Sequence, residues 1–154
     1  MKISELISGG KIISDLKGTT KEEIINELID LFKDDENVVN LESIRKAVLD
    51  REKIMSTGVG KGFAIPHAKT NSVNEIIAAF GKLKSPIDFQ SLDKEPVNLV
   101  MLLVAKESQV GPHIKLLSRI SRMVNNDGFR ESLSKAETES EILSIIEEEE
   151  KKYI

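Results

Sequence analysis

The chain of 154 residues contains no cysteine and no tryptophan. Without cysteine it has no disulfide framework, no thiolate nucleophile and no zinc–thiolate site. Its longest apolar run, residues 97–105, is about half of the roughly 18 residues that a bilayer-spanning helix needs. The N-terminal segment also lacks the apolar core and cleavage site of a secretory signal. These absences agree with a cytoplasmic protein that has no membrane segment of its own.

The chain also lacks an excess of basic charge, and it has few aromatic side chains. The net charge is −4, and the aromatic residues are five phenylalanines and one tyrosine. Surfaces that bind nucleic acid are usually basic and stack bases on aromatic rings. Nucleic acid is therefore not an expected partner.

The residues that are present predict one α/β domain over residues 1–154. The composition, 40% hydrophobic and 31% charged, is ordinary for a globular chain of this length. Apolar patterns predict strands at residues 10–16, 75–83 and 97–105. Helices are expected at residues 19–32, from 41 to about 51, from 112 to about 124, from 129, and from 139. The interleaved order favours a sheet covered by helices on both faces.

Local signals fix several helix starts. Side-chain caps are expected at Thr20 with Glu23, at Asn40, and at Thr138 with Glu141. Pro112 is placed at the first position of its helix, where a missing N–H costs nothing. The tail "EEEEKKYI", residues 147–154, is expected to be a solvated helix end.

The segment "GVGKG", residues 58–62, is rich in glycine but matches no nucleotide-binding pattern. A P-loop would need glycine where Met55 stands, and the dinucleotide fingerprint would need glycine at Phe63. No cofactor is therefore expected. Backbone N–H groups and a lysine would suit an anion, although the glycines taken alone fit a tight turn better. The candidate anion-binding residues are Gly58, Gly60, Lys61 and Gly62.

Three further side chains are candidates for chemistry. His67 follows the glycine segment and a short apolar step; alone it fits a hydrogen-bonded histidine at a buried strand's end, but the combination favours a functional group. His113 lies in the first turn of the helix that begins near Pro112, either packed against the core or functional. Arg51 near a helix end is either a solvated charge or a fork for phosphoryl oxygens. With two histidines and neither HExxH nor GxSxG spacing, no metal site and no serine hydrolase are expected.

At "STGVGKGFAIPHA", residues 56–68, the sequence resembles the fructose/mannitol-type enzyme IIA family of the bacterial phosphoenolpyruvate-dependent sugar phosphotransferase system. The resemblance continues through residues 97–124 and 129–146. It implies a mixed sheet of about five strands between helices. It also implies that His67 accepts a phosphoryl group on Nε2, assisted by His113 and Arg51. The implied donor is the phosphocarrier HPr, and the implied acceptor is an enzyme IIB.

Two functions are compatible with this resemblance. The first is a phosphotransferase that works through phosphohistidine and serves uptake of a sugar of the fructose/mannitol class. The alternative is a nitrogen-related regulatory IIA protein, in which phosphorylation of His67 controls partner proteins. In this branch IIB uses a cysteine and IIC is membrane-embedded, so both are expected on separate chains. Sugar specificity is expected to lie in IIB and IIC, since a IIA domain touches only other proteins.

Overall fold

The computed structural model describes residues 1–154 and contains one six-stranded mixed sheet. The strands are β1 (Ile12–Ile13), β2 (Gly58–Gly60), β3 (Phe63–Ala64), β4 (His67–Lys69), β5 (Ile77–Ile87) and β6 (Val97–Ala105). Their order is β1-β5-β6-β3-β2, and β4 pairs with β6 beyond the end of β3. Strand β5 is antiparallel to β6, whereas β3 and β4 are parallel to it. The predicted α/β class and mixed sheet are confirmed.

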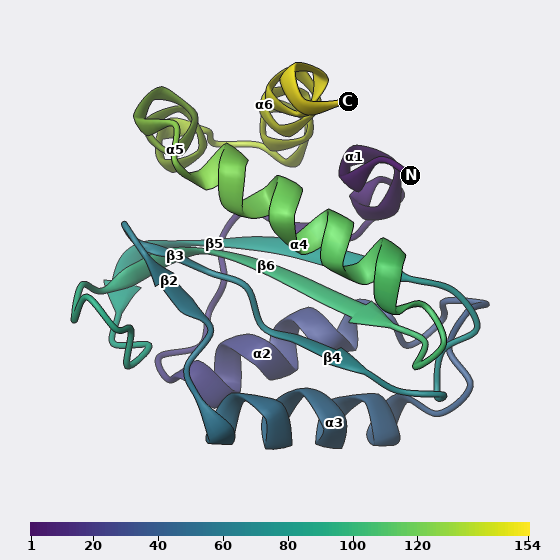
Figure 1. Ribbon diagram of the computed structural model, residues 1–154. Coiled ribbons are helices and arrows are strands. Elements are labelled where there is room, and N and C mark those ends of the chain that lie inside the picture. Colours follow the sequence, from purple (N-terminus) through teal and green to yellow (C-terminus); the bar gives the residue numbers. More distant parts are fainter.

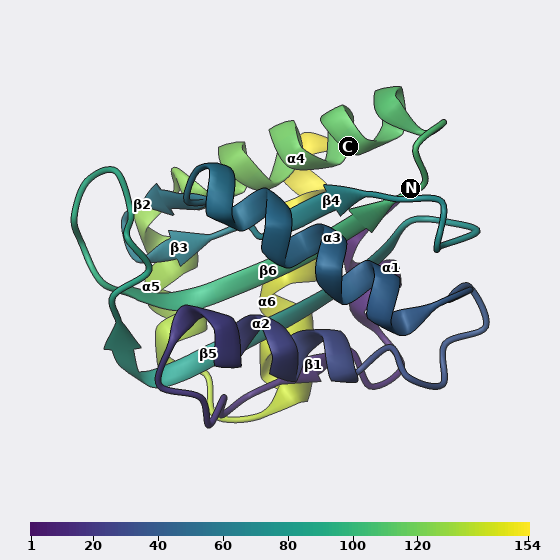
Figure 2. The ribbon, with the colours of Figure 1, turned by 90° about the horizontal axis from the view of Figure 1, so that it is seen from below.

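Helices cover both faces of the sheet (Figure 1). They are α1 (Ile3–Ile7), α2 (Lys21–Asp30), α3 (Leu41–Ile54), α4 (Val110–Val124), α5 (Asp127–Lys135) and α6 (Glu139–Glu150), followed by the 3₁₀ turn η1 (Lys151–Tyr153). Helices α2 and α3 lie across one face (Figure 2), and the other four helices lie across the opposite face. We call these the lower and the upper helical layer, as they are drawn in Figure 1.

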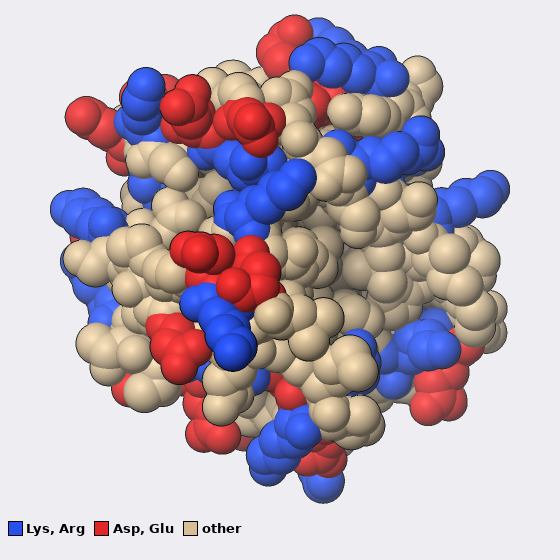
Figure 3. All heavy atoms as spheres, turned by 60° about the vertical axis from the view of Figure 1, so that its left-hand side comes forward, with Lys and Arg blue, Asp and Glu red and all other residues tan.

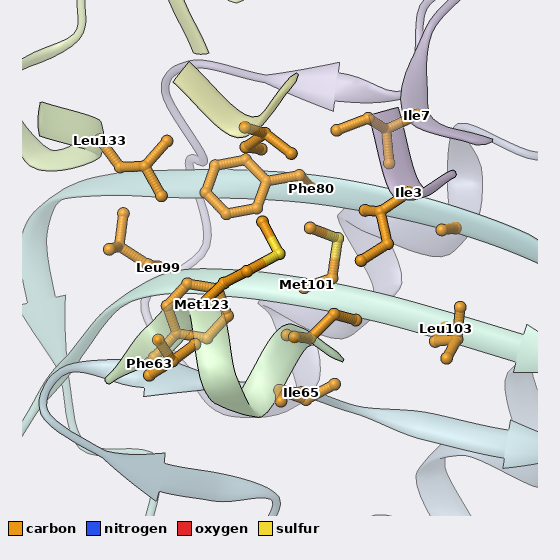
Figure 4. Close-up of a cluster of buried hydrophobic side chains, with 14 of the residues drawn as sticks. Ile3, Ile7, Phe63, Ile65, Phe80, Leu99, Met101, Leu103, Met123 and Leu133 are labelled. Atoms are coloured by element: carbon orange, nitrogen blue, oxygen red, sulfur yellow. The ribbon is translucent and has the colours of Figure 1, made fainter. Parts of the chain in front are cut away.

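Each layer encloses its own apolar core, and strand β6 contributes to both. Leu99, Met101 and Leu103 point into the upper core, where they meet Phe80 of β5 and Ile3 of α1 (Figure 4). The side chains between them along the strand belong to the lower core with α2 and α3: Val100, Leu102 and Val104. This alternation follows from the two-residue period of a strand and explains why β6 is apolar at nearly every position.

The predicted caps of α2, α3 and α6 are present. The Thr20 hydroxyl accepts from the Glu23 N–H at 3.2 Å, and Thr138 accepts from Glu141 at 3.1 Å. The Asn40 side chain accepts from the Ser43 N–H at 3.0 Å. Each of these side chains satisfies one of the N–H groups that a helix start leaves unpaired.

Two helices begin earlier than predicted. Helix α4 starts at Val110, so Pro112 is its third residue rather than its first. Proline is tolerated there because the first-turn N–H groups have no acceptor within the helix. Helix α5 starts at Asp127, because the Asn126 side chain caps it by accepting from the Phe129 N–H.

The expectation that residues 147–154 form a solvated helix end is wrong at two positions. Glu149 and Glu150 are buried. The Glu150 carboxylate accepts from the N–H groups of Ile3 at 2.7 Å and Ser4 at 3.1 Å, and it pairs with Arg119 at 2.9 Å. A carboxylate with these donors is stable in a buried position, and it ties α6 to the N-terminal helix α1.

Charged side chains are mixed rather than segregated on the face drawn in Figure 3. Lysine and arginine alternate there with aspartate and glutamate, and a broad uncharged area lies beside them. None of the helices is both long and apolar enough to cross a membrane.

Candidate functional site

A cleft of ≈ 380 Å³ opens at the edge of the sheet, where β4 lies between helices α3 and α4. Its titratable and charged residues are Arg51, His67, Lys69 and His113. Its apolar residues are Ala47, Ala68, Val110, Ile114 and Leu117. The structure therefore brings together three of the residues singled out in the sequence, from three separate elements.

His67 reaches this edge because the chain runs alongside β6 twice. Strand β3 pairs with the first half of β6, Pro66 interrupts the strand, and β4 pairs with the second half. The Pro66 carbonyl accepts from the Leu103 N–H at 3.0 Å, which keeps the two strands together across the interruption. His67 is paired with Leu103 on one side only, so its half-buried ring borders the cleft.

The hydrogen bonding of His67 determines which ring nitrogen is free. Its Nδ1 lies 2.7 Å from the Ile65 carbonyl oxygen. A carbonyl can only accept, so the proton is assigned to Nδ1 and the lone pair to Nε2. Burial lowers the pKa of His67 below its ordinary value, against the opposing effect of this hydrogen bond, and the nearby Arg51 charge lowers it further. At neutral pH the ring is therefore uncharged, with Nε2 available as a nucleophile.

His113 stands edge-on to His67 in the first turn of α4. The ring centroids are 5.6 Å apart and the ring planes meet at 89°. His113 is only 3% exposed, and its buried Nε2 has no hydrogen-bond partner. Burial lowers the pKa of His113 to about 4, together with the positive charges of His67 when it is protonated and of Lys69. A buried polar atom without a partner is costly, and His113 lines the cleft, so a ligand oxygen that reached Nε2 would satisfy it.

Two cations complete the cleft. Arg51 lies in the last turn of α3, and its Nη1 donates to the Met55 carbonyl at 3.0 Å. Lys69 was not identified from the sequence. It lies two residues beyond His67 on β4, and side chains at that spacing project to the same side of a strand. A strand of three residues is too short for its alternation to be recognised in the sequence.

The glycine segment lies elsewhere. Gly58, Gly60, Lys61 and Gly62 form the β2–β3 hairpin and do not line the cleft. Phe63 pairs with Leu99 and His67 with Leu103, four residues further along β6. At about 3.3 Å per residue, this step separates the hairpin from the histidine by roughly 13 Å.

The hairpin uses its glycines for its own conformation. The φ angles of Gly60, Lys61 and Gly62 are 94°, 58° and 80°, a left-handed turn that glycine adopts without strain. The Lys61 N–H donates to the Asp93 carboxylate at 3.0 Å rather than to an open hollow. A Cβ at Gly58 would lie 2.1 Å from the Ser91 Oγ, so glycine is also needed for this close approach.

Comparison with known proteins identifies, over almost the whole chain, the enzyme IIA family that the sequence resembles. Residues 5–149 match the family described as "Phosphoenolpyruvate-dependent sugar phosphotransferase system, EIIA 2". The fructose-specific EIIABC component of the phosphotransferase system of Bacillus subtilis is 36% identical over 151 residues, which are 98% of this chain and 24% of that protein. This chain thus spans about a quarter of the length of that relative.

Two further relatives are nitrogen regulatory proteins. The protein of Bradyrhizobium diazoefficiens is 34% identical over 146 residues, which are 95% of each chain. The crystal structure of the nitrogen regulatory protein IIA-Ntr from Neisseria meningitidis superposes with a TM-score of 0.87 at 28% identity. That superposition covers 94% of this chain and 98% of the other.

Proposed function

Because the chain belongs to the EIIA 2 family of the phosphoenolpyruvate-dependent sugar phosphotransferase system, a family of phosphoryl carriers, we propose that His67 is its phosphoryl acceptor. The resemblance noted in the sequence is confirmed at the level of the family. We propose further that phospho-HPr is the donor and an enzyme IIB the acceptor, in sugar uptake of the fructose/mannitol class. We expect a carrier of this kind to act in the cytoplasm.

The observation that carries the proposal is the hydrogen bond between His67 Nδ1 and the Ile65 carbonyl. It leaves the Nε2 lone pair free to attack phosphorus, and the N–P bond forms as the bond to the donor breaks. The proton stays on Nδ1, so the ring gains positive charge that the carbonyl oxygen stabilises. A cationic ring is also a good leaving group, which suits onward transfer to a second protein.

The other cleft residues are suited to the charge on the transferred group. Positioning and charge stabilisation dominate phosphoryl transfer. Arg51 supplies a permanent positive charge, and His113 with its proton on Nε2 supplies a neutral donor to a phosphoryl oxygen. Losing a donor of this kind typically costs about 2.7–4 kcal/mol of barrier, or roughly 10²–10³ in rate.

The test is phosphoryl transfer from phosphoenolpyruvate through enzyme I and HPr to the purified chain. The wild type should acquire an acid-labile, base-stable phosphoryl group, and His67→Ala should acquire none. Arg51→Ala and His113→Ala should be labelled slowly. Lys61→Ala is the matched control, a cation lost outside the cleft, and it should be labelled at the wild-type rate. Labelling of His67→Ala would overturn the proposal.

A regulatory role is the second candidate, and the full-length match to the Bradyrhizobium nitrogen regulatory protein favours it. The two roles share the first step and differ in the second. In sugar uptake, the phosphorylated chain should pass its group to an enzyme IIB and then, with IIC, to a sugar. In a regulatory role, the phosphorylated chain should keep its group when IIB is added and change its affinity for a partner protein instead.

A further inference from the structure

The cleft mechanism does not use Glu52, although its carboxylate is one of the most buried charges in the fold. Glu52 follows Arg51 on α3 and is 4% exposed. It accepts from the Thr57 N–H at 2.9 Å and from the Thr57 hydroxyl at 2.6 Å, and Lys21 Nζ lies 3.3 Å away. A buried carboxylate is destabilising unless donors surround it, and this one has three.

Thr57 continues this contact into the strand that leads to the histidine. The Thr57 carbonyl accepts from the Ile65 N–H at 3.0 Å. The Ile65 carbonyl in turn accepts from His67 Nδ1 at 2.7 Å. The peptide group before Ile65 is therefore held by Thr57, and the peptide group after Ile65 is held by the imidazole of His67. A continuous series of hydrogen bonds runs from the buried carboxylate to the ring.

We propose that Glu52 is a positioning residue for His67, acting through Thr57 and the Ile65 carbonyl to hold the imidazole with Nε2 free. The inference rests on the proposed function, because it assigns Glu52 a role in the readiness of the phosphoryl acceptor. Without the contact between Glu52 and Thr57, the Ile65 carbonyl is free to shift away from Nδ1. The ring then loses the partner that selects the Nδ1–H tautomer, and a fraction of molecules carries the proton on Nε2, where attack is blocked.

Glu52 also acts on the ring through its charge. Its negative charge raises the pKa of His67, whereas the positive charges of Arg51 on the same helix and of Lys69 on β4 lower it. Removing the carboxylate charge should therefore lower the pKa of His67. Weakening of the Ile65 hydrogen bond would lower the same pKa, so Glu52→Gln should lower it more than Thr57→Val, which keeps the carboxylate charge.

Glu150 provides a matched control within the same chain. It is 1% exposed, accepts from two backbone N–H groups and pairs with Arg119, so like Glu52 it is a buried carboxylate with three donors, one of them a cation. It lies in the upper helical layer, across the sheet from α3 (Figure 1). No hydrogen bond connects it to the cleft.

The experiment records the imidazole ¹⁵N resonances of the purified chain, without any donor protein, across a pH titration. Glu52→Gln and Thr57→Val should increase the Nε2–H tautomer of His67 and lower its pKa, and Glu52→Gln should lower the pKa further because it also removes a negative charge. Thr57→Ser keeps the hydroxyl and should retain the wild-type spectrum. Glu150→Gln should lower the melting temperature and leave the His67 resonances unchanged. Phosphorylation by phospho-HPr should then be about tenfold slower in Glu52→Gln and in Thr57→Val, the effect of losing about one hydrogen bond.

The proposal is overturned if folded Glu52→Gln and Thr57→Val both keep the wild-type tautomer and pKa of His67. It is also overturned if Glu150→Gln alters His67 to the same extent, because the effect would then be general loosening. Should Glu52→Gln not fold, Thr57→Val decides the question alone. Failure of the proposed function is a separate result, since the tautomer is measured without transfer and absence of labelling in the wild type affects only the phosphoryl assay.

Discussion

Acidification from pH 7 to pH 5 should destabilise the fold through His113. The pKa of this buried ring is about 4 in the folded chain, whereas an ordinary histidine titrates near 6.5. Between these two values the unfolded chain binds a proton that the folded chain does not. The stability that the neutral His113 ring contributes is therefore fully present above pH 6.5 and is lost as the pH falls toward 4.

The size of the effect follows from the same interval. One unit of pKa difference corresponds to about 1.4 kcal/mol, so the loss at pH 5 is about 2 kcal/mol and the loss at pH 4 roughly 3 kcal/mol. The pKa of His67 is lowered as well, by burial first and then by Arg51, so its contribution has the same sign. Lys69 lowers the pKa of both rings, and a proton on His67 further opposes protonation of His113.

Urea unfolding of the wild type and of His113→Gln at a series of pH values isolates this contribution. Glutamine does not titrate, so the free energy of unfolding of the variant relative to the wild type should rise by about 2 kcal/mol between pH 7 and pH 5. The carboxylate of Glu150 is common to both proteins. Burial opposes its ionisation, but its N–H donors and Arg119 hold its pKa below the ordinary value of 4.5, so the stability that it contributes is lost mainly below pH 4.5. A constant difference between the two proteins from pH 7 to pH 5 would refute the argument that burial keeps His113 neutral.

Three other substitutions test separate parts of the structure. Lys69→Gln should raise the pKa of both cleft histidines in an NMR titration, because the positive charge of Lys69 lowers them; unchanged values would mean that solvent screens this charge completely. Gly58→Ala should lower the free energy of unfolding in urea by about 1–3 kcal/mol, because its Cβ would lie 2.1 Å from the Ser91 Oγ. Adding Ser91→Gly should restore most of that loss, and a double variant as unstable as the single one would exclude this clash as the cause. Lys82→Met should cost roughly 1–3 kcal/mol, because Nζ donates to three backbone carbonyls at the end of α5, which would all lose this donor. Its phosphorylation rate should equal that of the wild type, since Lys82 lies outside the cleft.

Features that depend on near neighbours could be predicted from the sequence. The caps at Thr20, Asn40 and Thr138 bond to N–H groups three residues away, so the pattern contains both partners. Strand β6 could be predicted because a strand buried on both faces is apolar throughout. Helix α1 could not, because its five residues are held by the carboxylate of Glu150, some 147 positions away. Nothing local indicates that such a short segment is a helix.

The glycine segment shows the same limit within the site. Its glycines are required, as expected, by a tight turn and a close approach, but the partner of that approach is not in the motif. Asp93, which accepts from the Lys61 N–H, and Ser91, which lies against Gly58, are more than thirty residues further along the chain. A pattern of glycines and a lysine predicts a conformation, whereas the neighbour that the conformation meets is decided by strand pairing.

Strand pairing also accounts for the meeting of the two histidines, which no spacing in the sequence predicts. Strand β4 runs parallel to β6, and His67 pairs with Leu103 near the carboxyl end of β6. Residues 106–109 then turn the chain back into α4, so His113 returns to the same end of the sheet. This arrangement depends on register, because a shift of one residue would turn His67 toward the lower core, where Ala68 is now buried. The hydrogen bond from the Leu103 N–H to the Pro66 carbonyl opposes that shift. Pro66 has no N–H with which to continue the pairing beyond β3, and its carbonyl fixes the register in which His67 borders the cleft.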